Sequence, residues 1–212
     1  MLPTDRLLAF GITASVVIVI PGPSVLFVVG RALACGRRVA LLTVVGNALG
    51  EYVQVIAVAF GVGALAEQSV AAFTTLKLLG GAYLIYLGVK TFRERGSLAT
   101  ALGTPVTIRS DRRAFLQGWT VGVTNPKTVV FLAAILPQFV NRSAGGVPVQ
   151  ILILGAVFAL IAVASDTVWA TVAGGFRAWF SRDPRRLELI GGAGGLAIVA
   201  VGAGLLVSGR KN

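Results

Sequence analysis

The stretch "VTNPKTVVFLAAILPQF", residues 123–139, places an amide, a proline and a lysine inside an otherwise apolar run. Proline removes a backbone donor and clashes with the preceding helical turn, so Pro126 predicts an interrupted helix. An ammonium group at mid-membrane costs about 3 kcal/mol, so Lys127 is expected to face the interior of a helix bundle. Backbone groups freed by the interruption must be buried in protein or line a watery cavity. The stretch therefore predicts a polar site inside a bundle of membrane helices.

The composition of the whole chain agrees with a polytopic membrane protein. Of its 212 residues, 56% are hydrophobic and 13% are charged, whereas a soluble domain carries about 25% charged residues. A spanning helix needs about 20 mostly apolar residues. We expect an all-α fold with six transmembrane helices at about residues 7–29, 40–64, 70–90, 114–139, 148–173 and 189–208. No connection is long enough for a soluble domain, so function is expected within the helices.

The net charge of +11 is distributed unevenly along the chain. The connections after the first, third and fifth spans hold Arg31, Arg37, Arg38, Lys90, Arg93, Arg95, Arg109, Arg112, Arg113, Arg177, Arg182, Arg185 and Arg186. The opposite side holds only Arg6, Arg142, Arg210 and Lys211. Because cytoplasmic loops collect Lys and Arg, both termini are predicted to lie outside the cytoplasm. The basic charge is interpreted as an orientation signal with contacts to anionic membrane lipids, and no nucleic-acid partner is expected.

Two halves of the chain resemble each other. Phe10 lies eleven residues before Pro21, and Phe115 lies eleven residues before Pro126. The third and sixth spans both enter with a Leu-(Leu/Ile)-Gly-Gly-Ala segment. We therefore predict one transporter domain, 1–212, built of two inverted three-helix repeats with helices 1 and 4 interrupted. Its parts are repeat one at about 1–92, a basic linker at about 93–113 and repeat two at about 114–212.

The first interruption is predicted at "IPGPS", where Pro21 and Pro23 flank Gly22. Paired interruptions in corresponding helices of two halves are the best sequence indication of a transporter binding site. The second half-helix begins at such a break, and its N-terminus is partly positive and suited to a carboxylate. The alternative at both breaks is a proline kink that only shapes packing.

Three further polar residues are candidates for this site. Glu51 and Asp166 lie in corresponding helices of the two halves, and either is a candidate partner for Lys127. Asn47 lies one turn before Glu51 on the same helix face. The chain has no histidine, so carboxylates must carry any proton coupling. Which of the two acids carries the proton is left open, as is a purely structural pairing with Lys127.

At this point the motifs resemble a known family. The segments "PGPSVLFVVGRALACGRR", "LKLLGGAYLIYLGVKTFR" and "GVTNPKTVVFLAAILPQF" look like the LysE/RhtB amino-acid exporter family, over nearly the whole chain. The resemblance implies a bacterial inner-membrane exporter of amino acids or close derivatives that uses the proton gradient. By matching motif positions it assigns importance to Pro21, Gly22, Pro23, Asn125, Pro126, Lys127, Pro137, Gln138 and Phe139.

Other functions remain alternatives. Two buried acids with an amide ligand suit a hard divalent metal cation, whereas the absence of histidine and the single cysteine argue against a soft metal. An intramembrane enzyme needs a nucleophile and a base, and no such arrangement is evident. Paired breaks with opposite buried charges favour alternating access over a passive channel. No cofactor, catalytic residue or resident metal is expected, and the oligomeric state, including a homo-oligomer, stays open.

Overall fold

The computed structural model describes residues 2–62, 70–94, 110–175, 183 and 185–207. Within these ranges the regular structure is entirely helical, which confirms the predicted all-α class. The α-helices are α1 (Thr4–Val19), α2 (Pro23–Cys35), α3 (Arg37–Ala57), α5 (Val70–Arg93), α7 (Asp111–Thr124), α8 (Pro126–Val130), α9 (Val147–Gly175) and α11 (Arg185–Val207).

The two predicted interruptions are present at the predicted residues. The chain bends by 54° between α1 and α2, and by 41° between α7 and the segment that begins with α8. Pro23 and Pro126 each begin the second helix of their pair, where the missing N–H of proline removes no helical hydrogen bond. Gly22, between Pro21 and Pro23, is extended, with φ −111° and ψ −170°. Each break is thus a short extended hinge with a proline-started helix after it.

The segment after α8 is irregular over its whole length. A π-helical turn, Phe131–Ile135, is followed by a 3₁₀ turn, Leu136–Phe139, and a second 3₁₀ turn, Arg142–Ala144. A second π-helical turn, Val58–Val62, continues α3. π-helical turns are rare and are frequently found at functional sites.

Most of these helices have the length and the hydropathy that a membrane span requires. In the described residues, Arg37–Gly61, Val147–Gly175 and Glu188–Val207 are each long and apolar enough to cross a membrane. Counting each bent pair as one span brings the total to five. The remaining helix, α5, is 24 residues long, and the count of six spans stays a prediction.

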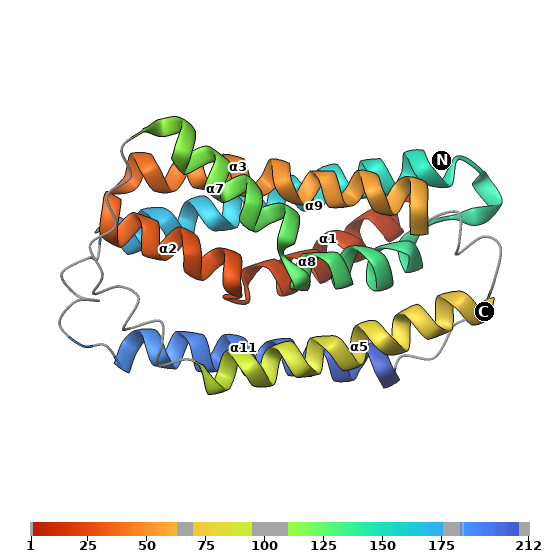
Figure 1. The fold of residues 1–212 in the computed structure, drawn as a ribbon. Helices are drawn as coiled ribbons and strands as arrows, with labels where there is room; N and C mark the ends of the chain where they lie inside the picture. The colour runs from red at the N-terminus through yellow and green to blue at the C-terminus, as the bar shows by residue number, and fades with distance from the viewer. Residues whose placement is uncertain (1, 63–69, 95–109, 176–182, 184, 208–212) are drawn as a thin grey trace.

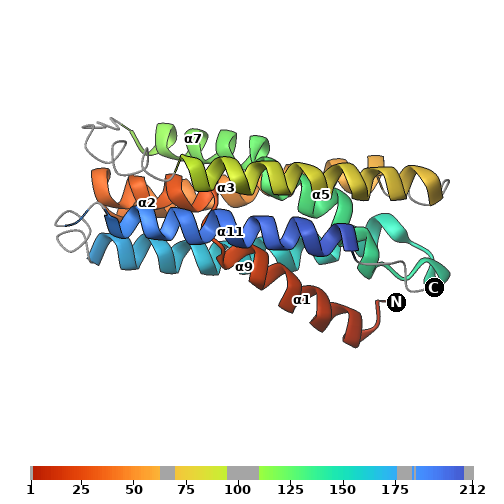
Figure 2. The ribbon, with the colours of Figure 1, turned by 90° about the horizontal axis from the view of Figure 1, so that it is seen from below.

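The helices form two layers (Figure 1). Helices α5 and α11 form one layer and the remaining α-helices form the other. Seen from below, α5 and α11 run side by side (Figure 2). Glycines allow α5 and α11 to approach closely: a Cβ on Gly88 would lie 2.6 Å from the carbonyl oxygen of Gly195. The pair also contacts a break, because a Cβ on Gly194 would lie 2.2 Å from the carbonyl oxygen of Pro21.

Helices α3 and α7 approach each other even more closely through glycines from both sides. A Cβ on Gly46 would lie 2.1 Å from the Phe115 carbonyl oxygen, and a Cβ on Gly122 would lie 2.1 Å from the Asn47 carbonyl oxygen. Small residues let backbones approach in this way in membranes. This contact fixes the helix that carries Asn47 and Glu51 against the helix that ends at the second break.

Gly46→Ala and Gly122→Ala are each expected to destabilise the protein, because the added methyl group forces α3 away from α7. Overpacking of this kind costs about 1–3 kcal/mol. The matched control is Gly11→Ala in α1, where the structure places nothing within 4 Å of the new Cβ. Thermal unfolding of the purified protein in detergent measures the effect. A midpoint for Gly46→Ala equal to that of Gly11→Ala would contradict the close approach.

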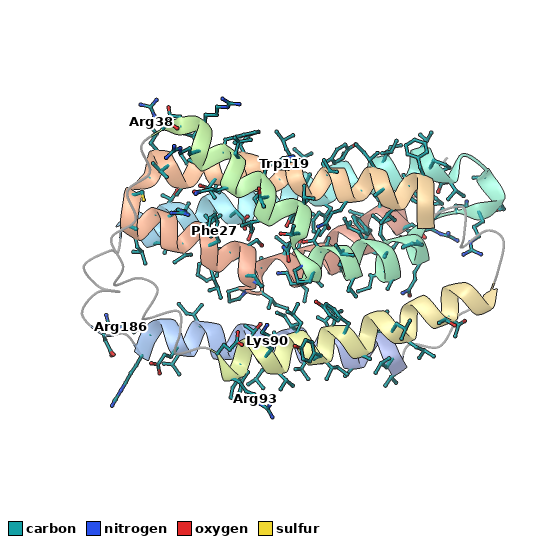
Figure 3. All side chains as sticks on the ribbon, viewed as in Figure 1. Phe27, Arg38, Lys90, Arg93, Trp119 and Arg186 are labelled. Carbon is teal, nitrogen blue, oxygen red and sulfur yellow. The ribbon has the colours of Figure 1, made fainter. Side chains whose placement is uncertain are left out.

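Four basic side chains share one half of the molecule. Arg38, Lys90, Arg93 and Arg186 lie in the half of the molecule where α3 and α7 begin (Figure 3). Helix α1 begins, and α11 finishes, at the opposite end (Figure 1). Residues 95–109 of the basic linker, together with Arg177, Arg182, Arg210 and Lys211, lie outside the described residues.

Candidate functional site

A small buried cavity lies where the two breaks meet. Its polar lining comes from α2, α3, α8 and α9 and consists of Ser24, Glu51, Lys127, Thr128 and Asp166. The volume open to the centre of a water molecule is about 10 Å³, roughly the space for one water. An amino acid does not fit in such a volume.

Lys127 is buried, with 5% of its surface exposed. Its Nζ donates hydrogen bonds to the carbonyl oxygens of Val17, at 3.1 Å, and Ile20, at 3.0 Å. These carbonyls belong to the end of α1 and the hinge after it, where the break leaves them without helical partners. A lysine at the second break therefore caps the backbone of the first break, and it links the two broken helices directly.

The predicted direct partner of Lys127 was a carboxylate, and the structure differs from that prediction. Neither Glu51 nor Asp166 forms an ion pair with Nζ, although both lie near enough to interact with it electrostatically. The physical reason is local, because the interruption at Pro21 exposes carbonyl oxygens that a buried ammonium can reach. Lys127 lines the cavity together with Glu51 and Asp166, and the role of these three residues stays a prediction.

Gly22 lies directly against the Lys127 side chain. A Cβ at this position would lie 3.1 Å from Nζ and 3.2 Å from Cε. The backbone of Gly22 is extended, a conformation that any residue adopts. Glycine is therefore needed here to leave room for the Lys127 side chain, and the backbone angles do not require it.

Gly22→Ala is expected to destabilise the protein by about 1.5 kcal/mol, because the methyl group displaces the ammonium from the carbonyls that it caps and weakens a hydrogen bond of a charged group. Gly11→Ala is the control here too, since its Cβ meets nothing within 4 Å. Thermal unfolding of the purified protein in detergent is the measurement, and equal midpoints for the two variants would contradict the proposed contact.

Glu51 is 3% exposed and is held by the segment after the second break. Its Oε1 accepts hydrogen bonds from Thr128 Oγ1 at 3.0 Å and from Asn125 Nδ2 at 3.2 Å. Its Oε2 is buried without a hydrogen-bond partner among the described residues. One oxygen therefore fixes the carboxylate, and the other is free to receive a donor.

Asn125 joins the parts of the site. Its Nδ2 donates to Ser24 Oγ at 3.1 Å as well as to Glu51, and its Oδ1 accepts from the backbone N–H of Lys127 at 3.2 Å. The side chain therefore caps α8 and reaches both α2 and α3. This arrangement explains why an amide, with donors and an acceptor, stands at the break.

Asp166 approaches from α9 and is 3% exposed. Its Oδ2 accepts a hydrogen bond from Asn47 Nδ2 at 3.2 Å. Asn47 Oδ1 is buried without a partner among the described residues. The structure thus brings Asn47, Glu51, Asn125, Lys127 and Asp166 together from α3, the second break and α9.

Sequence reasoning missed Gln54, Ser24 and Thr128. The Nε2 of Gln54 donates to the carbonyl oxygens of Gly122 and Val123, both at 2.8 Å, so it caps the end of α7 much as Lys127 caps the end of α1. A signal was present, because Asn47, Glu51 and Gln54 form a polar stripe at helical spacing on an apolar helix. Ser24 and Thr128 carry no such signal, since single hydroxyls are common in membrane helices.

The remaining predicted residues lie around the site rather than in it. Pro21 and Pro126 are half-buried at the hinges, and Pro23 is exposed. Pro137 is buried in the 3₁₀ turn and Gln138 is exposed, donating to the Ala134 carbonyl oxygen at 2.7 Å. These prolines shape the backbone, and Gln138 satisfies a carbonyl of its own turn.

A row of phenylalanines leads away from the cavity wall. Phe158 and Phe131 line the cavity and stack with centroids 5.3 Å apart. Phe10 continues the row, 6.0 Å from Phe131, and Phe139 follows at 5.5 Å. Phe139 of the predicted motif therefore belongs to the aromatic packing that closes one side of the site.

The chemistry available to a ligand comes from two carboxylates, one ammonium and several amides. Within the described residues no group of three or more His, Cys, Asp or Glu side chains comes together. Its charged groups suit the binding of a charged ligand and the exchange of a proton.

Comparisons with known proteins match most of the chain. Residues 15–209 match the family model described as LysE type translocator. The chain is 33% identical to the homoserine/homoserine lactone efflux protein of Salmonella typhimurium, over 95% of this chain and 96% of that protein. The protein of the same description from Salmonella typhi gives the same values. An uncharacterized membrane protein of Vibrio cholerae is 36% identical over 70% of this chain and 71% of its own. No solved structure matches.

Proposed function

The chain belongs to the LysE type translocator family, and from that premise we propose that this multi-pass membrane protein is a secondary exporter of amino acids or their close derivatives. The observation that carries the proposal is the small cavity beside the two helix breaks, lined by Glu51, Lys127 and Asp166. The two Salmonella relatives support an amino-acid-like substrate, because both are homoserine/homoserine lactone efflux proteins. No feature of the described residues favours an enzyme.

Export is proposed to be coupled to proton entry. The chain has no histidine, so a carboxyl group is the only side chain at the site suited to taking up and releasing a proton near neutral pH. Glu51 and Asp166 face one cavity from different helices. In the proposed cycle one of them takes up a proton when the substrate leaves, and it returns the proton to the cytoplasmic side.

Alternating access is proposed to depend on the two interrupted helices. Residues about 1–92 and about 114–212 form inverted repeats, with about 93–113 as the basic linker, and a two-fold rotation brings Pro21 to the position of Pro126. The similar bends of 54° and 41° support this correspondence. In an experimental structure, failure of the two halves to superpose under that rotation would refute it.

An efflux screen tests the proposed function. Vesicles containing the protein are loaded with each free amino acid, and efflux is followed with the outside made more acidic than the inside. We expect acceleration for at least one amino acid, and no acceleration when the gradient is absent. If a hard divalent cation is the cargo instead, Mg²⁺ or Mn²⁺ leaves the vesicles and no amino acid does.

The protein is proposed to lie in the bacterial inner membrane with both termini outside the cytoplasm. The orientation is proposed because Lys and Arg collect on the cytoplasmic side of membrane proteins. The four basic side chains labelled in Figure 3 lie in the half of the molecule away from the start of α1 and the end of α11. Reporter fusions at the C-terminus measure the orientation. A reporter active only in the cytoplasm should be silent there, and a strong cytoplasmic signal would reverse the proposed topology.

A further inference from the structure

The hydrogen-bonding capacity of the cavity is one-sided. Thr128 and Asn125 donate to Glu51 Oε1, and Asn47 donates to Asp166 Oδ2. Two acceptor atoms stay without a donor, because Glu51 Oε2 and Asn47 Oδ1 are buried and have no partner among the described residues. Buried polar groups without partners are rare and call for an explanation.

Lys127, the buried cation at this cavity, does not offset the two unpaired acceptors. It donates two of its N–H groups to the Val17 and Ile20 carbonyls. An ammonium has three donors, so one remains. The cavity is therefore lined by two carboxyl groups and by a lysine whose hydrogen bonds are mostly used to hold the first break.

We infer that the site recognises its substrate through a primary ammonium group at Glu51 Oε2, and that a free carboxylate on the substrate is dispensable. An ammonium supplies three donors and one positive charge, which matches an unpaired carboxylate oxygen with further acceptors nearby. Amino acids whose carboxyl group is converted to an amide, ester or lactone are accepted like the parent amino acid. Amino acids whose amino group is acylated are rejected. The inference rests on the proposed function and names the chemical class of its substrates.

The burial of Glu51 makes this recognition selective. Glu51 is 3% exposed, and its other oxygen is held in place by two donors from the second break. A substrate without an ammonium leaves Glu51 Oε2 buried and unpaired, which weakens binding beyond the lost contact itself. A substrate without a carboxylate leaves no corresponding donor unpaired, except the last N–H of Lys127.

Competition in counterflow tests the inference with the unaltered protein. Vesicles transport a labelled amino acid found by the efflux screen, with L-homoserine and L-leucine tested first. The competitors are the matched derivatives: homoserine lactone and N-acetyl-homoserine, or leucinamide and N-acetyl-leucine. We expect the lactone and the amide to compete within about threefold of the parent. The N-acetyl compounds should compete at least about 10-fold more weakly, the effect of losing a hydrogen bond to a charged group.

The outcomes separate the inference from the function on which it rests. If N-acetyl compounds compete as well as the parent, or if the amide and lactone fail to compete, ammonium recognition is overturned while amino-acid export stands. If no free amino acid is transported at all, the proposed function fails and the inference with it. Glu51→Gln supplies a second measurement, since it should remove the preference for the amide over the N-acetyl compound. Persistence of the preference in a folded Glu51→Gln protein places the ammonium elsewhere.

Discussion

Replacement of Lys127 by methionine is expected to reduce export to background, at least about 100-fold below the unaltered protein. The methionine retains the length of the side chain but leaves the Val17 and Ile20 carbonyls buried without a donor. Each unsatisfied buried group costs about 1–3 kcal/mol, and about 1.4 kcal/mol corresponds to tenfold in rate. The charge near Glu51 and Asp166 is also lost. Efflux from vesicles, normalised to inserted protein, is the measurement.

A matched lysine supplies the control. Lys90→Met makes the same chemical change at an exposed position near the end of α5, and it should leave export within about twofold, as surface changes away from special features usually do. A double variant, Lys127→Met with Glu51→Gln, removes one charge of each sign. It should insert in the membrane yet remain inactive, because no donor replaces Nζ at the break. Near-normal, gradient-dependent export by this variant would show that Lys127 and Glu51 have only a structural role.

Replacing Glu51 and Asp166 by their amides is expected to impair two different steps of transport. Glu51→Gln keeps an acceptor for Thr128 and Asn125 but places an amide where the free Oε2 lies. Binding of the substrate ammonium should weaken by about 10-fold to 100-fold, the range for hydrogen bonds to charged groups. Both counterflow and gradient-driven efflux should therefore fall together.

Asp166→Asn is expected to uncouple transport instead. The new side chain still offers an acceptor to Asn47 but cannot exchange a proton. Counterflow should persist while acceleration by a pH gradient disappears. Counterflow at several pH values, beside efflux with and without the gradient, distinguishes the two acids. If Glu51→Gln keeps counterflow and loses the gradient dependence, the roles of Glu51 and Asp166 are exchanged.

Some features of this protein follow from the sequence alone because their causes are local. Proline lacks an N–H and fixes its own φ, so Pro21, Pro23 and Pro126 interrupt helices whatever surrounds them. The apolar runs require a membrane, and the energy of a buried ammonium requires Lys127 to face the interior. Asn47 and Glu51, one turn apart, place one polar face of α3 toward the interior in the same way.

The partners of these groups were decided only by the tertiary structure. Lys127 caps Val17 and Ile20 instead of pairing with an acid, and Gln54 caps the end of α7. Both contacts join segments far apart in the chain, so they depend on the depth and rotation of one helix against another. That depth and rotation are fixed by packing, such as the glycines that bring α3 against α7. The sequence shows which buried groups need hydrogen-bond partners. The relative positions of the helices determine whether a donor meets a carbonyl, an amide or a carboxylate oxygen, because each of these oxygens can accept the same hydrogen bond.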